Sequence, residues 1–148
     1  MKNLMFLAFI FICVNSHAQS NNPKQLVFDF FEAFHEQDTV KLKTFATESL
    51  QLKSVSMNSE GKTTISTSAY SEFVKSIASI PKNVKFEEKI YEYRIEENGL
   101  LATVTTPYTF FFNGEKSHCG INVFNMVKME GDWKIIFLMD SRTKQHCN

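Results

Sequence analysis

The sequence predicts an α+β fold in which three helices from the N-terminal half pack on a strongly curved, mainly antiparallel sheet. Before Pro81, three segments carry apolar residues at helical spacing, and after it the pattern changes to alternation. Asn98-Gly99 and Asn113-Gly114 are strong hairpin signals. A third hairpin is expected at Glu130-Gly131-Asp132, because Gly131 tolerates the positive φ of a tight reversal. These observations place a meander of strands in the C-terminal half.

Local signals set the order of the elements. Asn22-Pro23 opens the first helix, because Asn caps helices and Pro fits the first turn. Asp38 caps a short second helix, and a third begins near Ser68 and stops at Pro81. Two strands lie between the second and third helices, and four follow the third. The predicted order is α-α-β-β-α-β-β-β-β.

Two irregularities are expected in the second half. The apolar phase slips within the strand from Val84 to Ile95, which predicts a β-bulge near Glu88 to Ile90. Pro107 interrupts the next strand and cannot donate a ladder hydrogen bond, so a bulge or an edge is expected there.

The N-terminus predicts export. Leu4 to Val14 is an unbroken run of 11 apolar residues after Lys2, and a membrane-spanning helix needs about 20. Ser16-His17-Ala18 offers a cleavage site, so residues 1–18 are interpreted as a signal peptide and residues 19–148 as one domain. The protein is expected to be periplasmic or secreted. A lipid anchor at Cys13 is the alternative, disfavoured because bulky Ile12 precedes it.

The charge balance argues against two classes of partner. Removal of Lys2 leaves one more acidic than basic side chain, and the basic residues are scattered. Nucleic acid and anionic membrane surfaces are bound through clustered basic residues. We therefore expect no nucleic-acid partner and no stable membrane anchor.

Two groups of residues carry a family resemblance. Phe30-Phe31-x-x-Phe34, Asp38 and Leu42-x-x-Phe45 lie in the opening helices, and Gly131-Asp132-Trp133-Lys134-Ile135 lies in the closing hairpin. With the order of elements, they make the chain similar to the nuclear transport factor 2-like superfamily, including its SnoaL-like and lumazine-binding-like groups. The resemblance implies a cone-shaped domain with an internal pocket, and dimers formed through the sheet.

The resemblance leaves the function open, because that superfamily contains both enzymes and binding modules. Its isomerases use a Tyr on the first helix, where this chain has Phe28, Phe30, Phe31 and Phe34. We therefore transfer no isomerase role to this sequence.

Strand arithmetic groups the candidate site residues. If Asn113-Gly114 and Glu130-Gly131 are two-residue turns, Cys119 lies opposite Tyr108 and Arg142. Tyr108, Cys119, Asp140 and Arg142 then share one face, and His118 and Asn122 lie on the other. Both faces are apolar otherwise, which favours a homodimer that covers the face left free by the helices.

Each candidate has a functional and a structural interpretation. Tyr108, Asp140 and Arg142 could close the polar end of a pocket, with Arg142 binding an anionic group. Alternatively, Arg142 and Asp140 form an ion pair that ties down the strand end. His118 could act as a general base, or be a half-buried residue whose hydrogen bonds are satisfied by Asn122 and its neighbours.

The cysteines predict a bridge. Cys119 and Cys147 remain after export, and an even cysteine count in an oxidising compartment indicates a disulfide. The alternative is a buried free Cys119 and a loose Cys147. No metal-ligand spacing and no cofactor motif is found, so neither a metal nor a cofactor is expected.

These points define two functional hypotheses. The first is an exported, dimeric binding domain for a small apolar or amphipathic molecule, with Tyr108, Asn122, Asp140 and Arg142 at the site. The alternative is an acid–base enzyme of the isomerase, dehydratase or cyclase type, with His118 or Asp140 as its catalytic group. A third, weaker interpretation is a dimeric scaffold whose pocket is filled by its own Phe side chains.

Overall fold

A computed structural model of the chain describes residues 22–145 and 147, and three helices precede Pro81 as predicted. They are α1 (Pro23–Glu36), α2 (Thr39–Thr44) and α3 (Tyr70–Ser79). The side chain of Asn22 accepts from the Lys24 amide at 2.8 Å, and Asp38 caps α2 in the same way. The start of α3 differs, because Ala69 occupies its cap position and makes no side-chain hydrogen bond.

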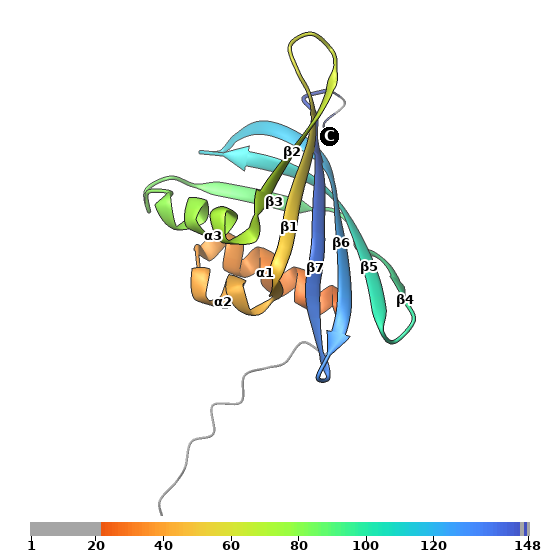
Figure 1. The fold of residues 1–148 in the computed structure, drawn as a ribbon. Coiled ribbons are helices and arrows are strands. Elements are labelled where there is room, and N and C mark those ends of the chain that lie inside the picture. The colour runs from red at the N-terminus through yellow and green to blue at the C-terminus, as the bar shows by residue number, and fades with distance from the viewer. Residues whose placement is uncertain (1–21, 146, 148) are drawn as a thin grey trace, which may run out of the picture.

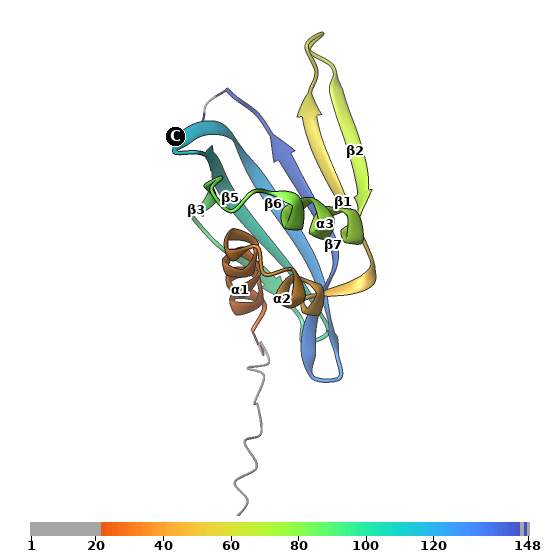
Figure 2. The ribbon, with the colours of Figure 1, turned by 90° about the vertical axis from the view of Figure 1, so that its left-hand side faces the viewer.

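The strands form one curved seven-stranded sheet, open at its edges. They are β1 (Ala46–Met57), β2 (Thr63–Ala69), β3 (Phe86–Ile90), β4 (Arg94–Glu97), β5 (Leu101–Phe112), β6 (Glu115–Met129) and β7 (Asp132–Arg142). The order is β2-β1-β7-β6-β5-β3, with β4 also on β5. Only the β1–β7 pair is parallel. The helices cover one face of this sheet, which confirms the predicted α+β class (Figures 1 and 2).

The slip in apolar phase has a different cause from the one predicted. The expected single strand is two strands, and the break lies between Ile90 and Arg94 rather than near Glu88 to Ile90. Ile90 pairs with Tyr108, while Arg94 pairs with Thr105, so the register changes by one residue. The Pro107 carbonyl accepts from the Tyr91 amide. The position where Pro107 lacks an N–H therefore lies opposite the break between β3 and β4.

The hydrophobic core fills the space between helices and sheet. Val27, Leu42, Phe124 and Ile135 are completely buried, and Trp133 is 2% exposed. The Phe30 ring packs edge-on against Phe124, which joins α1 to β6. The core thus holds the long helix α1 against the concave face of the sheet.

A disulfide holds the C-terminal tail, as predicted. Cys119 on β6 is bonded to Cys147, with their Cα atoms 5.5 Å apart. The Cys119 and Thr143 backbones also exchange two hydrogen bonds of 2.9 Å. Ser56 of β1 pairs with Arg142 of β7, so the tail and the β1–β2 hairpin lie at the same end of the molecule (Figure 1). Within residues 22–145, no helix is long and apolar enough to span a membrane.

Candidate functional site

Two β-bulges change the predicted grouping of the site residues. Both hairpins have the expected two-residue turns, since Phe112 pairs with Glu115 and Met129 with Asp132. Beyond them, however, Phe110 pairs with His118 and Asn125 with Phe137, so each ladder gains one unpaired residue.

The shift moves residues between faces, so the predicted sorting was wrong. Asp140 pairs with Asn122, and Tyr108 pairs with Gly120 rather than with Cys119. Because a shift of one residue exchanges the two faces, Asn122 joins Tyr108 and Asp140 on the concave face. Cys119 lies on the opposite face with its disulfide.

The concave face and the helices enclose a cavity of about 280 Å³. Its helix side is apolar and consists of Phe30, Phe31, Phe34, Phe73, Ile77 and Ile80. Its sheet side contains the polar residues Ser54, Glu88, Tyr108, His118, Asn122, Asp140 and Arg142. The structure thus brings together all the predicted ligand-binding residues and His118, and adds Ser54 and Glu88 to them.

Aromatic rings give the helix side a fixed shape. The Phe73 ring of α3 stacks against Phe30 and Phe34 of α1, with centroids 6.3 and 6.0 Å away. Phe34 also meets Phe86 of β3 edge-on at 5.0 Å. These aromatic pairs favour defined ring orientations, so they give this side of the cavity a defined apolar surface.

Glu88 is the polar residue that the sequence analysis missed. It follows Phe86 and precedes Ile90 at alternate positions of β3, so its side chain points the same way as two core-facing residues. Its carboxylate accepts from the Asn122 amide, which also donates to Thr106 Oγ1 at 3.2 Å. An acidic residue at an inward position was the signal that could have identified it.

The surroundings of Glu88 change its acidity. Burial raises the pKa of this carboxyl group to about 7, and the negative charge of Asp140 adds to the effect. The Asn122 hydrogen bond and the positive charge of Arg142 oppose it. Near neutral pH both protonation states of this group are therefore populated, and it can either donate or accept a hydrogen bond.

His35 fixes the backbone of Glu88. Its Nε2 accepts from the Glu88 amide at 2.9 Å, which requires that nitrogen to be unprotonated. Burial lowers the pKa of His35, although Glu87 raises it, so the neutral ring is favoured. This bond ties the end of α1 to β3 beside the cavity.

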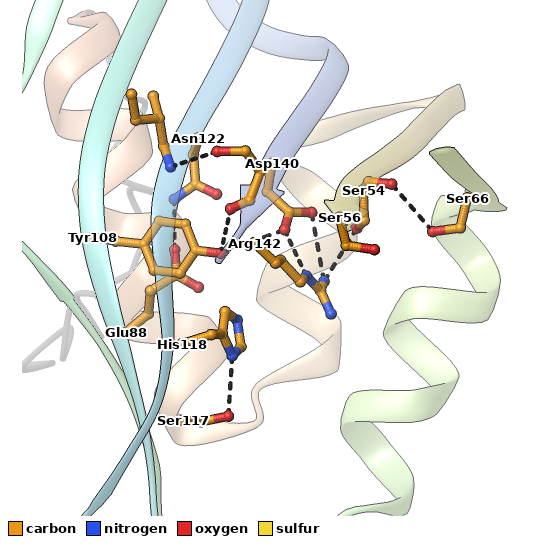
Figure 3. A network of polar contacts seen from close by, with 12 residues as sticks. Ser54, Ser56, Ser66, Glu88, Tyr108, Ser117, His118, Asn122, Asp140 and Arg142 are labelled. Atoms are coloured by element: carbon orange, nitrogen blue, oxygen red, sulfur yellow. Dashed lines mark hydrogen bonds and ion pairs between the residues drawn. The ribbon is translucent and has the colours of Figure 1, made fainter. Parts of the chain in front are cut away.

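Asp140 and Arg142 form an ion pair, as the structural alternative in the sequence analysis proposed. Arg142 Nε lies 2.6 Å from Asp140 Oδ2, and Nη2 donates to Ser54 Oγ at 3.1 Å. The Ser54 hydroxyl donates in turn to Asp140 (Figure 3). The Asp140 side chain is 14% exposed and that of Arg142 is 51% exposed. One side of the guanidinium is therefore committed to the protein, and the other remains accessible.

An irregular end of β7 positions Tyr108. The Tyr108 hydroxyl donates to the Ser141 carbonyl at 3.0 Å. The Ser141 side chain in turn accepts from the Ile121 amide, and so continues the pairing of β6 with β7. Gly120 permits this arrangement, because a Cβ there would lie 1.7 Å from the Ser141 oxygen and 3.1 Å from the Tyr108 ring. Burial raises the pKa of Tyr108, so it stays a neutral donor.

His118 lies at the rim of this network. Its ring stacks on Phe110 at 5.0 Å and meets Tyr108 edge-on. Its Nδ1 pairs with Ser117 Oγ at 3.1 Å rather than with the expected Asn122. Burial lowers its pKa, and Arg142 acts in the same direction. Among residues 22–145 and Cys147, no group of three or more His, Cys, Asp and Glu side chains could hold a metal ion.

No protein-family model and no curated protein matches this sequence. The fold, in contrast, is found in many solved structures. A Nostoc punctiforme protein of unknown function with a cystatin-like fold is 13% identical, with a TM-score of 0.62 over 82% of this chain and 89% of that one. A Novosphingobium aromaticivorans protein provisionally named a scytalone dehydratase is 15% identical, with a TM-score of 0.62 over 84% and 86%.

A third similar structure carries the family name. It is a Streptomyces avermitilis protein provisionally named a dehydratase of the nuclear transport factor 2-like family, 15% identical, with a TM-score of 0.61 over 81% and 92%. This chain therefore has the nuclear transport factor 2-like, or cystatin-like, fold that its sequence resembles.

Proposed function

We propose that the chain is a binding domain for a small, mainly apolar molecule that occupies the cavity between α1, α3 and the sheet. The observation that carries this proposal is the division of the cavity into an aromatic side and a polar side. An apolar pocket with a few convergent polar groups is the usual form of a small-molecule site.

The polar side favours a neutral group on the deeply bound part of the ligand. Asp140 already satisfies the inner side of Arg142, and Glu88 is protonated in part of the population at neutral pH. A hydroxyl or carbonyl group can pair with Glu88 in either protonation state, whereas a buried anion would meet two carboxyl groups. Asn122 and Tyr108 also belong to this polar surface, where Asn122 donates to Glu88 and Tyr108 donates to the Ser141 carbonyl.

Binding of the neutral probe 2-naphthamide tests this proposal, with a matched pair of variants. Ser76 lines the cavity and Ser79 does not, although both lie on α3 and both hydroxyls donate to the carbonyl three residues earlier. Ser76→Phe should weaken binding by about tenfold or more, because the added ring occupies the cavity mouth. Ser79→Phe should bind as the wild type does. Absence of wild-type binding, or equal losses in both variants, would overturn the proposal.

Acid–base catalysis on the bound molecule is a second candidate function, favoured by the pKa of Glu88 near 7. Asp140 and His118, the groups named from the sequence, lie at the same cavity. The test is exchange of carbon-bound hydrogen in D2O by any molecule that co-purifies with the protein. Hydrogen exchange that is lost in Glu88→Gln would support a catalytic function. Absence of exchange in the wild type would leave binding as the one remaining proposal.

We also propose that the protein is exported. The Cys119–Cys147 disulfide is typical of oxidising compartments, and the apolar run predicted as a signal peptide lies in residues 1–18, outside the described residues. The intact mass of exported protein should correspond to a chain beginning at Gln19. A lipid attached at Cys13 would contradict this.

A further inference from the structure

A second hollow adjoins the cavity and is lined by residues of the β1–β2 hairpin and the C-terminal tail. These two segments lie at the same end of the molecule (Figure 2). The second hollow is an open groove of about 730 Å³. One side is the hairpin, from Val55 to Asn58 with Thr63, and the other is the tail from Ser141 to Gln145. His118 and Arg142 line both the groove and the cavity, so these two side chains lie where the two hollows adjoin.

The groove is polar and carries positive charge. Arg142 and Lys144 belong to its lining, and among the described residues no Asp or Glu does. The side of Arg142 that does not face Asp140 and Ser54 is available there, because Nη1 makes no hydrogen bond within the described part of the chain (Figure 3). Arg142 and Lys144 both act on His118 as nearby cations. The cavity, in contrast, is apolar on its helix side and holds two carboxyl groups.

We propose that the groove binds the anionic head group of an amphiphilic ligand whose apolar part occupies the cavity. The cavity has room for roughly nine groups of methylene or water size at ~30 Å³ each, about one fused bicyclic ring system. A carboxylate, sulfonate or phosphate attached to such a body passes between His118 and Arg142 and reaches Nη1 of Arg142 and Nζ of Lys144. This inference rests on the proposed binding function and adds the chemical class of the ligand.

The two parts of the ligand suit the two hollows for separate physical reasons. The aromatic cavity removes apolar surface from water, which is favourable whatever the head group is. The groove is open, so ion pairs with the head group are partly screened and contribute modestly. Affinity should therefore come mainly from the cavity, and the preference for an anion mainly from the groove.

Two isosteric probes separate these contributions, namely neutral 2-naphthamide and anionic 2-naphthoate, compared by calorimetry at low and high salt. We expect 2-naphthoate to bind the wild type about fivefold more tightly at low salt, and this advantage to shrink at high salt. Lys144→Gln should remove most of the advantage while leaving 2-naphthamide binding unchanged. The control is Lys43→Gln, an exposed lysine of α2 away from the groove, and it should change neither.

The possible results distinguish failure of this inference from failure of the proposed function. Equal affinity for the two probes, or an anion preference that Lys144→Gln does not reduce, would overturn the head-group site and leave cavity binding intact. Binding of neither probe would overturn both. Naphthalene-2-sulfonate and 2-naphthyl phosphate extend the series, and their ranking identifies which anionic head group the groove fits best.

Discussion

The orientation and the acidity of Glu88 are set by its neighbours along the strand and its partners across the sheet. On β3 it occupies an inward position between Phe86 and Ile90, and Asn122 of β6 supplies its hydrogen bond. A carboxyl group in such surroundings keeps its proton to higher pH than in water, because burial disfavours the charged form. The same group therefore destabilises the folded state once it ionises.

This destabilisation predicts a pH-dependent stability. Between pH 4.5 and about 7 the folded chain binds more protons at Glu88 than the unfolded chain, so the unfolding free energy falls as pH rises through this range. The loss should be about 3 kcal/mol, complete above the folded-state pKa. Glu88→Gln keeps the hydrogen bond from Asn122 and removes the titration. The difference in unfolding free energy between variant and wild type therefore isolates the contribution of Glu88 ionisation.

Urea unfolding of both proteins at pH 4.5, 6 and 8 measures this difference. Glu88→Gln should be the more stable protein at pH 8 and should lose its advantage toward pH 4.5. A stability difference that does not change with pH would show that Glu88 titrates as an exposed acid does.

At the scale of single residues, the sequence identified Tyr108, His118, Asn122, Asp140 and Arg142 but not Glu88. The first five stand out because they are the less common residues of long apolar strands. Glu88 instead lies in the charged segment Glu87-Glu88-Lys89, where an inward acid looks like part of a solvated face. Its backbone amide donates to His35, which lies on a helix 53 residues earlier in the chain, and local patterns do not reveal such a contact.

At the scale of elements, helices and turns were predictable and the register of the strands was not. Asn113-Gly114 and Glu130-Gly131 fix two tight turns through local backbone preferences, and both have positive φ. The two bulges beyond them arise from how long, curved strands adapt to one another, which no single residue dictates. One unpaired residue in each ladder was enough to place Asn122 on the wrong face.

The disulfide gives a prediction at this scale. It closes a segment of 28 residues between β6 and the tail, and so restricts the unfolded chain. Cys147→Ser should lower the unfolding free energy by roughly 3.5 kcal/mol in the chain-entropy model. Urea unfolding of oxidised wild type and variant tests this, with reduced wild type as the control. Equal stabilities would mean that the tail contributes nothing to the fold.

At the scale of the whole molecule, the convex face of the sheet is expected to form a homodimer. Asn122 and Phe124 point to the core, so Ile121, which precedes Asn122 on β6, points to the opposite face and is 42% exposed. We propose that Ile121 packs against a second copy of the chain, because an exposed apolar side chain is removed from water at such an interface. Sedimentation at micromolar concentration should give twice the chain mass, and Ile121→Lys should give the monomer.

Ile65→Lys provides the control for the dimer. Ile65 lies on the edge strand β2 and is 63% exposed, so the substitution adds the same charge outside the proposed interface. A wild-type monomer, or dissociation by both variants alike, would count against a dimer formed through this face.

Native mass spectrometry of the protein purified from the exported fraction tests the central claim, occupation of the cavity by a small molecule, most directly. We expect a bound species of small mass that is retained by wild type and Ser79→Phe, and absent or depleted in Ser76→Phe. We also expect that this species carries an anionic group on an apolar body. A chain that shows only its own mass in every preparation, and that gains no mass on addition of 2-naphthamide or 2-naphthoate, would contradict the account.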